Sequence, residues 1–477
     1  MGQEIDSIQF KARDFNQYAK RLRQETELLL DLARSDKLSH RGPIAGFELE
    51  AWLVDENFQP APVNEAFIEA MADPLATLEL AQFNIELNIE PEHLMGRALS
   101  RLETTFNRTW TRATRIAMDL GTRLLTVGIL PTLRAEQLSL EYMSGLKRYR
   151  ALNQQLLRAR AGQPLKLDIV GNQHLKSEHH NLMLESAATS FQIHLEGAFE
   201  RVHHLYNAAV AVSAPMVAVG ANSPFLHGFD LWSETRIPLF EQSVELGGFN
   251  EAARGPLRRV GFGSGYAVDS IVECFTENLQ HFPVLLPMLF DNGPERFDHL
   301  RLHNGTIWRW NRPLIGFDRD GTPHVRIEHR VLPSCPSIAD AIAEAALFYG
   351  LVEGLCEEAT RLEARLPFAQ AKDNFYQAAR YGLKAPITWL DGEKSGIRAL
   401  LLDELIPLAR RGLLALGIEP CDCDRFLGII SRRVECGQNG AHWQREFVKR
   451  FGADMQALTA AYAEHQQDGT PVHTWEI

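Results

Sequence analysis

Cysteine is scarce in this sequence of 477 residues, with six cysteines spread between positions 274 and 436. None forms a CxxC pair, and Cys421-Asp422-Cys423 has no second pair at zinc-finger spacing. Six cysteines are too few for a disulfide scaffold in a chain of this length, so we expect reduced thiols in a reducing compartment. We interpret the Cys-x-Cys pair as incidental.

Long apolar runs and an excess of positive charge are also missing. No stretch of roughly 18 apolar residues is available to span a bilayer, and the beginning of the chain has no hydrophobic signal core. Lys and Arg total 49 against 61 Asp and Glu, a net charge of −12, which disfavours broad binding to phosphate backbones. We therefore expect a soluble, cytoplasmic protein whose partners include neither a membrane nor a nucleic acid. Its oligomeric state is not predicted.

Several common catalytic motifs are absent as well. The sequence has no HExxH, no GxSxG and no kinase signature. Gly261-Phe-Gly-Ser-Gly265 is similar to a phosphate loop, but it is neither a Walker A sequence nor a full GxGxxG, and no GK[ST] follows it. We interpret this segment as a flexible loop at an active site.

Helical patterns occupy both ends of the chain. Residues 10–36 have the spacing of an amphipathic helix, and similar patterns return at 97–122 and around 198–212. A further helix is predicted from Ser337, where Ser337-Ile-Ala-Asp340 has the spacing of a capping box. Residues 397–465 are predicted to be almost wholly helical.

The middle of the chain predicts strands and loops. Residues 223–266 are rich in glycine and proline, which favours loops with short helices. Hydrophobic residues make up 45% of the chain, enough for a sizeable core. We expect one interlocked α+β body, with a catalytic part over residues 1–400 and a helical extension over 401–477 packed on it.

Four short segments alternate apolar and polar residues with a period of two, as strands with one buried face do. They cover residues 46–53, 83–89, 191–196 and 325–330. Their polar faces contain no lysine. Segment by segment, these faces carry Glu48, Glu50 and Trp52; Asn84, Glu86 and Asn88; Gln192, His194 and Glu196; and Arg326, Glu328 and Arg330.

The polar faces allow two interpretations. One is an ordinary sheet with its second side in water. The other is a cluster of the four glutamates Glu48, Glu50, Glu86 and Glu328. Carboxylates gathered in one place either have raised pKa values or are neutralised by cations, and hard divalent cations such as Mg²⁺ suit them. His194 offers a nitrogen ligand. Arg326 and Arg330 offer the planar fork that suits phosphate oxygens.

Residues 304–313, with the sequence NGTIWRWNRP, precede the last of these strands. Arg309 and Arg312 stand beside Trp308 and Trp310, and such a set can hold an anionic group or a nucleotide base. The same pattern also fits tryptophans in the core with arginines at the surface. Both interpretations remain at this stage.

The same residues resemble the glutamate–cysteine ligase family of carboxylate–amine ligases. Gly46-Phe-Glu-Leu-Glu50 is similar to the family's opening G-x-E-x-E, and Glu86 to the glutamate of its next strand. Gln192-Ile-His194 resembles the strand that carries a metal-binding histidine. The remaining similar segments are Ala221-Asn-Ser-Pro-Phe225 with Arg236 downstream, Glu328-His-Arg330, and Arg380-Tyr-Gly-Leu383.

The resemblance implies a glutamine-synthetase-like fold, in which an antiparallel sheet forms an active-site funnel. It also implies ATP with Mg²⁺ or Mn²⁺, and activation of the glutamate γ-carboxylate as an acyl phosphate. Carried over to this chain, the metal ligands are Glu48, Glu50, Glu86, His194 and Glu328. Arg330 would face the transferring phosphoryl group, and we predict Arg330, Arg326 and Arg236 as the catalytic arginines. We predict that Arg309, Arg312, Trp310 and Asn222 bind the nucleotide.

The sequence departs from the family at one visible position. Many members have G-T-H-P where this chain has Gly128-Ile-Leu-Pro131, so Leu130 replaces a histidine. We therefore expect either γ-glutamylcysteine formation, the first step of glutathione synthesis, or the same chemistry with another amine acceptor. A non-catalytic binding protein of the same fold is the third hypothesis, and loss of metal carboxylates would be its mark. All four carboxylates are present.

Overall fold

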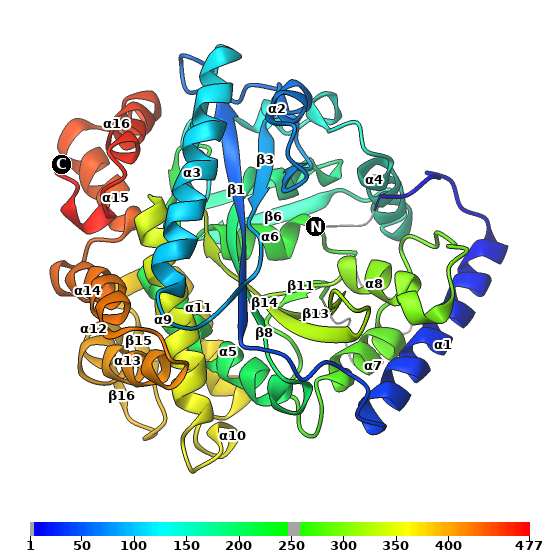
Figure 1. Cartoon of the computed structure of the whole chain (residues 1–477). Helices are drawn as coiled ribbons and strands as arrows, with labels where there is room; N and C mark the ends of the chain where they lie inside the picture. The colour runs from blue at the N-terminus through cyan, green and yellow to red at the C-terminus, as the bar shows by residue number, and fades with distance from the viewer. Residues whose placement is uncertain (1–3, 247–257) are drawn as a thin grey trace.

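One curved antiparallel sheet forms the centre of the protein (Figure 1). The computed structural model describes residues 4–246 and 258–477. Within these residues the sheet has eight strands in the order β13-β14-β8-β1-β3-β2, with β4 and β5 paired to opposite ends of β1. The strands are β1 (Ile44–Val54), β2 (Ala76–Leu78), β3 (Asn84–Asn88), β4 (Glu92–His93), β5 (Arg123–Leu125), β8 (Ser190–Glu196), β13 (Asn311–Phe317) and β14 (Pro323–Pro333).

The four strands predicted from alternation are confirmed, and they are neighbours. β14, β8, β1 and β3 lie side by side, so their polar faces join into one surface. Glu50 pairs with Glu86 across β1 and β3, and His194 of β8 lies between Gly46 of β1 and Glu328 of β14.

Long helices cover the apolar face of the sheet. They are α3 (Ala98–Asp119), α5 (Phe199–Gly220) and α9 (Ile338–Cys356), and Figure 1 shows α3 crossing in front of α9. Phe47 of β1 is in ring contact with Phe106 of α3 and Tyr349 of α9. The predicted N-cap of α9 is confirmed, because the Ser337 hydroxyl accepts a hydrogen bond from Asp340 N. Burial of these aromatic rings is the main force that fixes helices on this face.

Helix α5 differs from the sequence-based expectation. Among the described residues it is the one helix long and apolar enough to cross a membrane, although no such segment was predicted. In the structure, 89% of its most apolar window is buried inside the protein. A helix that is apolar on all sides is expected either in a membrane or in the middle of a large core. Here α5 is a core helix.

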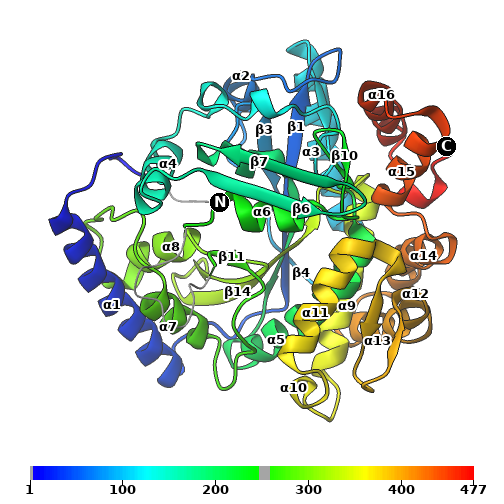
Figure 2. The ribbon, with the colours of Figure 1, turned by 180° about the vertical axis from the view of Figure 1, so that it is seen from behind.

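Smaller elements complete the fold (Figure 2). The predicted N-terminal helix is α1 (Ala12–Arg34), which packs on α7 (Val272–His281) and α8 (Asp298–Gly305). A hairpin of β6 (Leu165–Val170) and β7 (His174–His179) contacts α6 (Arg236–Ser243). The other small elements are α2 (Asn64–Met71), α4 (Lys147–Ala159), β9 (Phe225–Leu226), β10 (Phe229–Asp230), β11 (Val260–Gly261), β12 (Trp308–Arg309), α10 (Leu362–Arg365), α11 (Phe368–Tyr381), β15 (Pro386–Thr388), β16 (Lys394–Gly396) and α12 (Ile397–Leu400). The described part of the segment 223–266 consists of loops, short strands and α6; residues 247–257 lie outside the described residues.

The last part of the chain is helical, as predicted, and lies on the side of the sheet opposite α1 in both views (Figures 1 and 2). Its helices are α13 (Ile406–Ala415), α14 (Pro420–Cys436), α15 (Gly440–Phe451) and α16 (Met455–Gln467). α13 approaches α9 closely at a glycine pair, because a Cβ on Gly412 would lie 2.0 Å from Gly350 O. A continuous helical run, 397–415, passes through the predicted boundary at residue 400, and that boundary stays a prediction.

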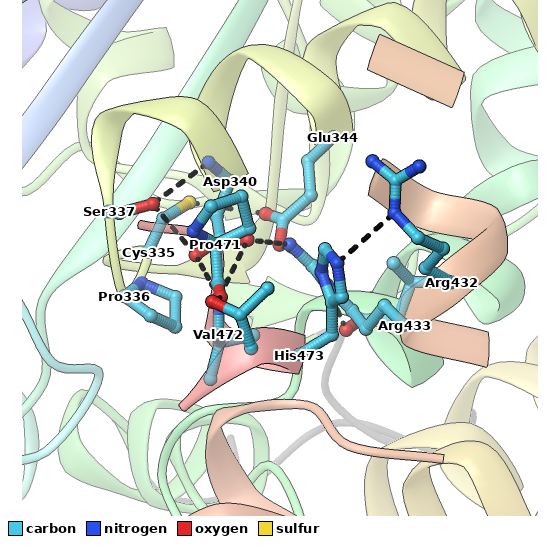
Figure 3. Close-up of polar contacts among 12 residues, drawn as sticks. Cys335, Pro336, Ser337, Asp340, Glu344, Arg432, Arg433, Pro471, Val472 and His473 are labelled. Atoms are coloured by element: carbon cyan, nitrogen blue, oxygen red, sulfur yellow. Dashed lines mark hydrogen bonds and ion pairs between the residues drawn. The ribbon is translucent and has the colours of Figure 1, made fainter. Parts of the chain in front are cut away.

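A buried ion-pair network fixes α14 to α9 (Figure 3). Arg433 of α14 is 2.6 Å from Asp340 Oδ1 and 2.5 Å from Glu344 Oε1, and all three side chains are at most 1% exposed. Asp340 also accepts hydrogen bonds from Ser337 Oγ and from Val472 N near the end of the chain. Each carboxylate therefore has a cationic partner, which is the condition under which buried charges are tolerated.

Candidate active site

The polar face of the sheet lines a cavity of about 550 Å³. Its wall includes most of the polar residues predicted from alternation, together with Arg301 and Phe317. The predicted residues that line it are Glu48, Glu50, Glu86, His194, Arg312, Arg326 and Arg330. The sheet face is therefore the wall of a cavity, not a surface facing open solvent.

A first group of candidate metal ligands consists of Glu48, His194 and Glu328. One ligand atom from each lies within 4.8 Å of the others. His194 Nε2 is 3.3 Å from Glu48 Oε1 and 3.9 Å from Glu328 Oε1, and it makes no hydrogen bond of ordinary geometry among the described residues. Burial lowers the pKa of His194 to about 4, which keeps the imidazole neutral. A neutral imidazole is the form that binds a metal.

Glu328 is ionised because two arginines face it. Arg312 donates from Nε and Nη2 to the two Glu328 oxygens at 2.8 and 3.1 Å, and Arg330 Nη1 donates at 3.0 Å. Although burial opposes ionisation, Arg312 and Arg330 hold the pKa of Glu328 well below its usual range. Arg312, predicted to bind the nucleotide, thus contacts a candidate metal ligand and the cavity at once.

A second group consists of Glu50, Glu79 and Glu86, again with ligand atoms within 4.8 Å of one another. Burial raises the pKa of Glu50 to about 7, although Arg330 opposes the shift. Burial and the Glu50 charge raise the pKa of Glu79 to about 7, and burial with the Glu48 charge raises that of Glu86 to about 8. These three carboxylates lie close enough to repel one another, and too few cations lie nearby to offset the repulsion.

Glu79 was not predicted from the sequence. It lies just after β2, where residues 76–80 (ATLEL) alternate apolar and polar side chains, but this run is shorter than the four segments from which strands were predicted. β2 pairs with β3, with Leu78 opposite Ile85, and this pairing brings Glu79 to the cavity beside Glu86. The position of Glu79 beside Glu86 follows from the pairing of β2 with β3.

The donor atoms of both groups fit divalent cations. Carboxylate oxygens with one imidazole suit Mg²⁺ or Mn²⁺, and a cation would remove the repulsion that raises the pKa values of the second group. Hydrogen bonds orient several ligands: Ser190 N and Gln192 Nε2 donate to Glu50, while Thr77 Oγ1 and Asn88 Nδ2 donate to Glu86. Such outer contacts hold ligands in place for a metal.

The three predicted catalytic arginines lie at different depths. Arg330 lines the cavity and contacts Glu328 and Gln192. Arg326 also lines it, and its Nε donates to His194 Nδ1 at 3.0 Å. Arg236 lies behind them, where its Nη2 donates to Arg330 O at 3.0 Å and Val331 O at 2.6 Å. These carbonyls lie where the pairing of β14 with β8 shifts register, between His329 and Leu332, so Arg236 holds the irregular strand that carries Arg330.

Three predicted nucleotide-binding residues do not line this cavity. Arg309 donates to Glu277 and Asn278 of α7, both at 2.8 Å. Trp310 is a core residue whose Nε1 donates to Glu241, whereas its neighbour Trp308 lines the cavity. The buried Asn222 side chain donates to Ser334 O and Tyr462 OH. We do not include these three in the proposed site.

A third group of possible ligands, Glu196, Asp318 and His324, lies farther along the same strands. Asp318 accepts from Ser39 Oγ at 2.7 Å and pairs with Arg41 at 3.1 Å, while His324 Nδ1 lies 3.1 Å from Asp318 Oδ1. Arg41 and Ser39 thus already contact Asp318, while Glu196 Oε1 is buried without a hydrogen-bond partner among the described residues.

Comparison with known proteins shows the family and the fold of this chain. A sequence model of glutamate–cysteine ligase family 2 (GCS2) matches residues 44–469. The crystal structure of glutamate–cysteine ligase from Francisella tularensis in complex with AMP is similar with a TM-score of 0.54 and 12% identity, over 90% of this chain and 89% of that one. A bifunctional glutathione synthetase from Pasteurella multocida gives a TM-score of 0.49 and 11% identity, over 92% of this chain and 53% of that one. No curated protein sequence matches the chain.

The family match covers most of the chain and includes every strand that lines the cavity. The structural likeness to the Francisella tularensis enzyme shows that the fold is the one the sequence predicted. The chain therefore belongs to glutamate–cysteine ligase family 2, and the protein is an ATP-dependent ligase.

Proposed function

We propose that this protein joins glutamate, through its γ-carboxylate, to the amine of cysteine, the first step of glutathione synthesis. The observation that carries the proposal is the pair of ligand groups on one sheet face, Glu48–His194–Glu328 and Glu50–Glu79–Glu86, with Arg330 in the same cavity. Because Glu48 and Glu50 are two residues apart on β1, the two groups are adjacent. The family description supports glutamate and cysteine as substrates.

ATP is the proposed co-substrate, with Mg²⁺ or Mn²⁺ held by Glu48, Glu50, Glu79, Glu86, His194 and Glu328. The similar ligase from Francisella tularensis was solved in complex with AMP, which supports a nucleotide in this fold. When bound, divalent cations would neutralise phosphate charge and the excess of glutamates. Glutamate, the amine and ATP are the proposed small-molecule partners, and the cytoplasm is the proposed compartment.

The chain's own residues supply positioning and charge stabilisation. A carboxylate is a poor electrophile, so its oxygen first attacks the γ-phosphorus of ATP, releasing ADP and giving γ-glutamyl phosphate. The amine then attacks the acyl carbon, loses a proton, and inorganic phosphate leaves. Arg330 and Arg326 face the cavity where negative charge develops on the transferred phosphoryl group. Arg236 positions Arg330 through the two carbonyls of β14.

Another amine acceptor is the alternative function. Leu130, which replaces a family histidine, is fully buried and does not line the cavity. Its effect on acceptor choice would therefore be indirect. ADP release screened over glutamate paired with a panel of amines, cysteine among them, identifies the acceptor. If another amine gives the highest kcat/KM, cysteine is replaced but the ligase chemistry stands.

An oxygen-transfer experiment tests the mechanism. Glutamate carrying ¹⁸O in its γ-carboxylate is expected to pass one labelled oxygen to inorganic phosphate as the amide forms, with ADP as the nucleotide product. Glutamate labelled in the α-carboxylate alone is the control and should leave the phosphate unlabelled. Label in AMP, with pyrophosphate released, would overturn the acyl-phosphate route.

A further inference from the structure

Glu185 is a carboxylate of the cavity wall that the proposed mechanism does not use. It belongs to a short 3₁₀ segment, Leu182–Ala187, between β7 and β8. Asn181 caps this segment by accepting a hydrogen bond from Met183 N at 2.9 Å, and Leu182, Met183 and Leu184 are buried in the core. The apolar side chains thus fix the segment, and its acidic residue is left at the cavity.

The position of Glu185 is at a junction. It lines the large cavity and also a smaller inner pocket of about 50 Å³. The inner pocket is walled by Glu50, Glu79, Arg236 and Arg330 as well as by the apolar residues Leu80 and Phe240. A space of about 50 Å³ holds only a few atoms, such as a small polar head group, and is smaller than the cavities of about 150 Å³ that admit an aromatic ring.

Glu185 differs from the other carboxylates in its contacts. Glu50 and Glu86 accept hydrogen bonds from protein groups, and Glu328 is paired with arginines. The Glu185 carboxylate has neither a hydrogen bond nor an ion pair with any residue that the structure describes. It also stands outside the two ligand groups proposed for cations.

Glu185 is half-buried, and a carboxylate that is partly removed from water without a protein partner is stabilised when a ligand supplies positive charge. The Glu50–Glu79–Glu185 side of the inner pocket is rich in negative charge, so a cation is the complementary ligand. Burial and the charge of Glu79 raise the pKa of Glu185 to about 8, which agrees with a missing positive partner. Both substrates of an amino-acid ligase carry a primary ammonium group of the right size.

We propose that Glu185 binds the ammonium group of an amino-acid substrate at the mouth of the inner pocket. The inference rests on the proposed ligase function, and the ammonium can come from the donor glutamate or from the acceptor. Two oxygens of one carboxylate can accept from two of the three ammonium N–H groups, which selects an amine over an uncharged isostere.

Equilibrium binding tests the site without turnover. Calorimetric titrations of the full chain, with Mg²⁺ and a non-hydrolysable ATP analogue, compare glutamate with glutarate and cysteine with 3-mercaptopropionate, which lack the amino group. Wild type should prefer one ammonium-bearing member by about tenfold or more, and Glu185→Gln should lose that preference. A glutamate-only effect assigns the donor, and a cysteine-only effect assigns the acceptor. Equal affinities within both pairs in wild type, or preferences unchanged in Glu185→Gln, overturn the proposal.

The matched control is Glu178→Gln, which removes an exposed carboxylate from β7. It should bind every ligand as wild type does. Turnover gives a second measurement, because hydroxylamine is an uncharged acceptor near neutral pH. If the acceptor's ammonium binds Glu185, Glu185→Gln should raise KM for cysteine about tenfold or more and leave KM for hydroxylamine unchanged. If the donor's ammonium group binds Glu185, the Glu185→Gln variant should instead show a raised KM for glutamate with either acceptor.

The experiments can refute the Glu185 site and the ligase function independently of each other. Preferential binding by wild type without glutamate-dependent ADP release would keep the ammonium site and refute the ligase function. Normal ligation by Glu185→Gln with unaltered KM values would refute the site and keep the function. A uniform fall in all affinities, together with a lowered melting temperature, would show a purely structural role and would also overturn the proposal.

Discussion

The protein has two buried groups of charged residues that differ in how their charges are balanced. Around Arg433, two carboxylates share one guanidinium and several hydrogen bonds (Figure 3), and these three residues are not among those that line the cavity. Around Glu50, three glutamates lie within ligand distance of one another and their pKa values rise to about 7 and 8. The first group joins two parts of the fold. The three glutamates of the second group are stable in their ionised form only when a cation binds beside them.

This difference separates structural from functional charge. A group whose carboxylates both contact a cation is held by its own contacts, so removal of that cation should appear in stability. An unbalanced group stores repulsion that a ligand relieves, so its loss should appear in ligand binding and turnover. The following predictions test that separation.

Removing Arg433 should have the largest effect on stability. Arg433→Met leaves Asp340 and Glu344 buried without their cation, which costs about 3–5 kcal/mol. Urea unfolding measures the change. The control is Arg432→Met, whose exposed side chain is the neighbour in sequence and should change stability by about 0.5 kcal/mol or less. Equal stability of the two variants would mean that the Arg433 network does not hold α14 in place.

Removing Glu79 should affect turnover instead. Glu79→Gln keeps the size of the side chain but deletes one ligand of the second group, and kcat should fall by about a hundredfold or more. The free energy of unfolding without metal should stay the same or rise, since one repelling charge is gone. Glu69→Gln on the exposed side of α2 is the control for steady-state assays. Full activity of Glu79→Gln would remove this residue from the site.

Divalent cations should stabilise the wild-type protein. Binding to the folded state alone adds about 2.7 kcal/mol at a concentration one hundred times Kd. Thermal melts with Mg²⁺, Mn²⁺ and a chelator measure this effect, and Glu79→Gln should show less of it. If the melting temperature is the same with metal and with chelator, both candidate ligand groups are contradicted.

The metal-free protein should lose stability as the pH rises. The folded pKa values of Glu50, Glu79 and Glu86 lie above the ordinary carboxyl value, so the folded state keeps protons that the unfolded state has released. Stability from these groups is present below about pH 4.5 and is lost as the pH passes 7 to 8. One retained proton changes the free energy of unfolding by about 1.4 kcal/mol per pH unit. Melts in chelator at pH 6 and pH 8 measure the slope, and added Mg²⁺ should flatten it.

The smallest effect is expected for the Cys-x-Cys pair. Cys421 is exposed on α14, so Cys421→Ser should alter stability by about 0.5 kcal/mol or less and leave kcat unchanged. Activity assays with and without a thiol reductant check this. Loss of activity would reveal a thiol site that neither the sequence nor the cavity indicates.

Alternation along single strands was enough to predict the sheet face and the candidate metal ligands on it. Glu48, Glu50, Glu86, His194 and Glu328 were predicted because period-two spacing reports side-chain direction directly. Glu79 and Glu185 were missed because each lies outside a strand and reaches the cavity only through tertiary packing. Packing also decided between the two interpretations of residues 304–313. Trp310 lies in the core, whereas Trp308 lines the cavity. The sequence alone does not reveal this difference between two tryptophans on one short segment.

Helix α9 contacts both the cavity strand β8 and the group around Arg433, and this affects how the protein unfolds. Tyr349 on α9 donates to the carbonyl of His194, while Asp340 and Glu344 on the same helix hold Arg433. Seventeen of its 19 residues are buried. The amide protons of α9 should therefore exchange with solvent only when the whole molecule opens, because no local fluctuation frees one side without breaking the other. The cavity and the C-terminal helices then unfold as one cooperative unit.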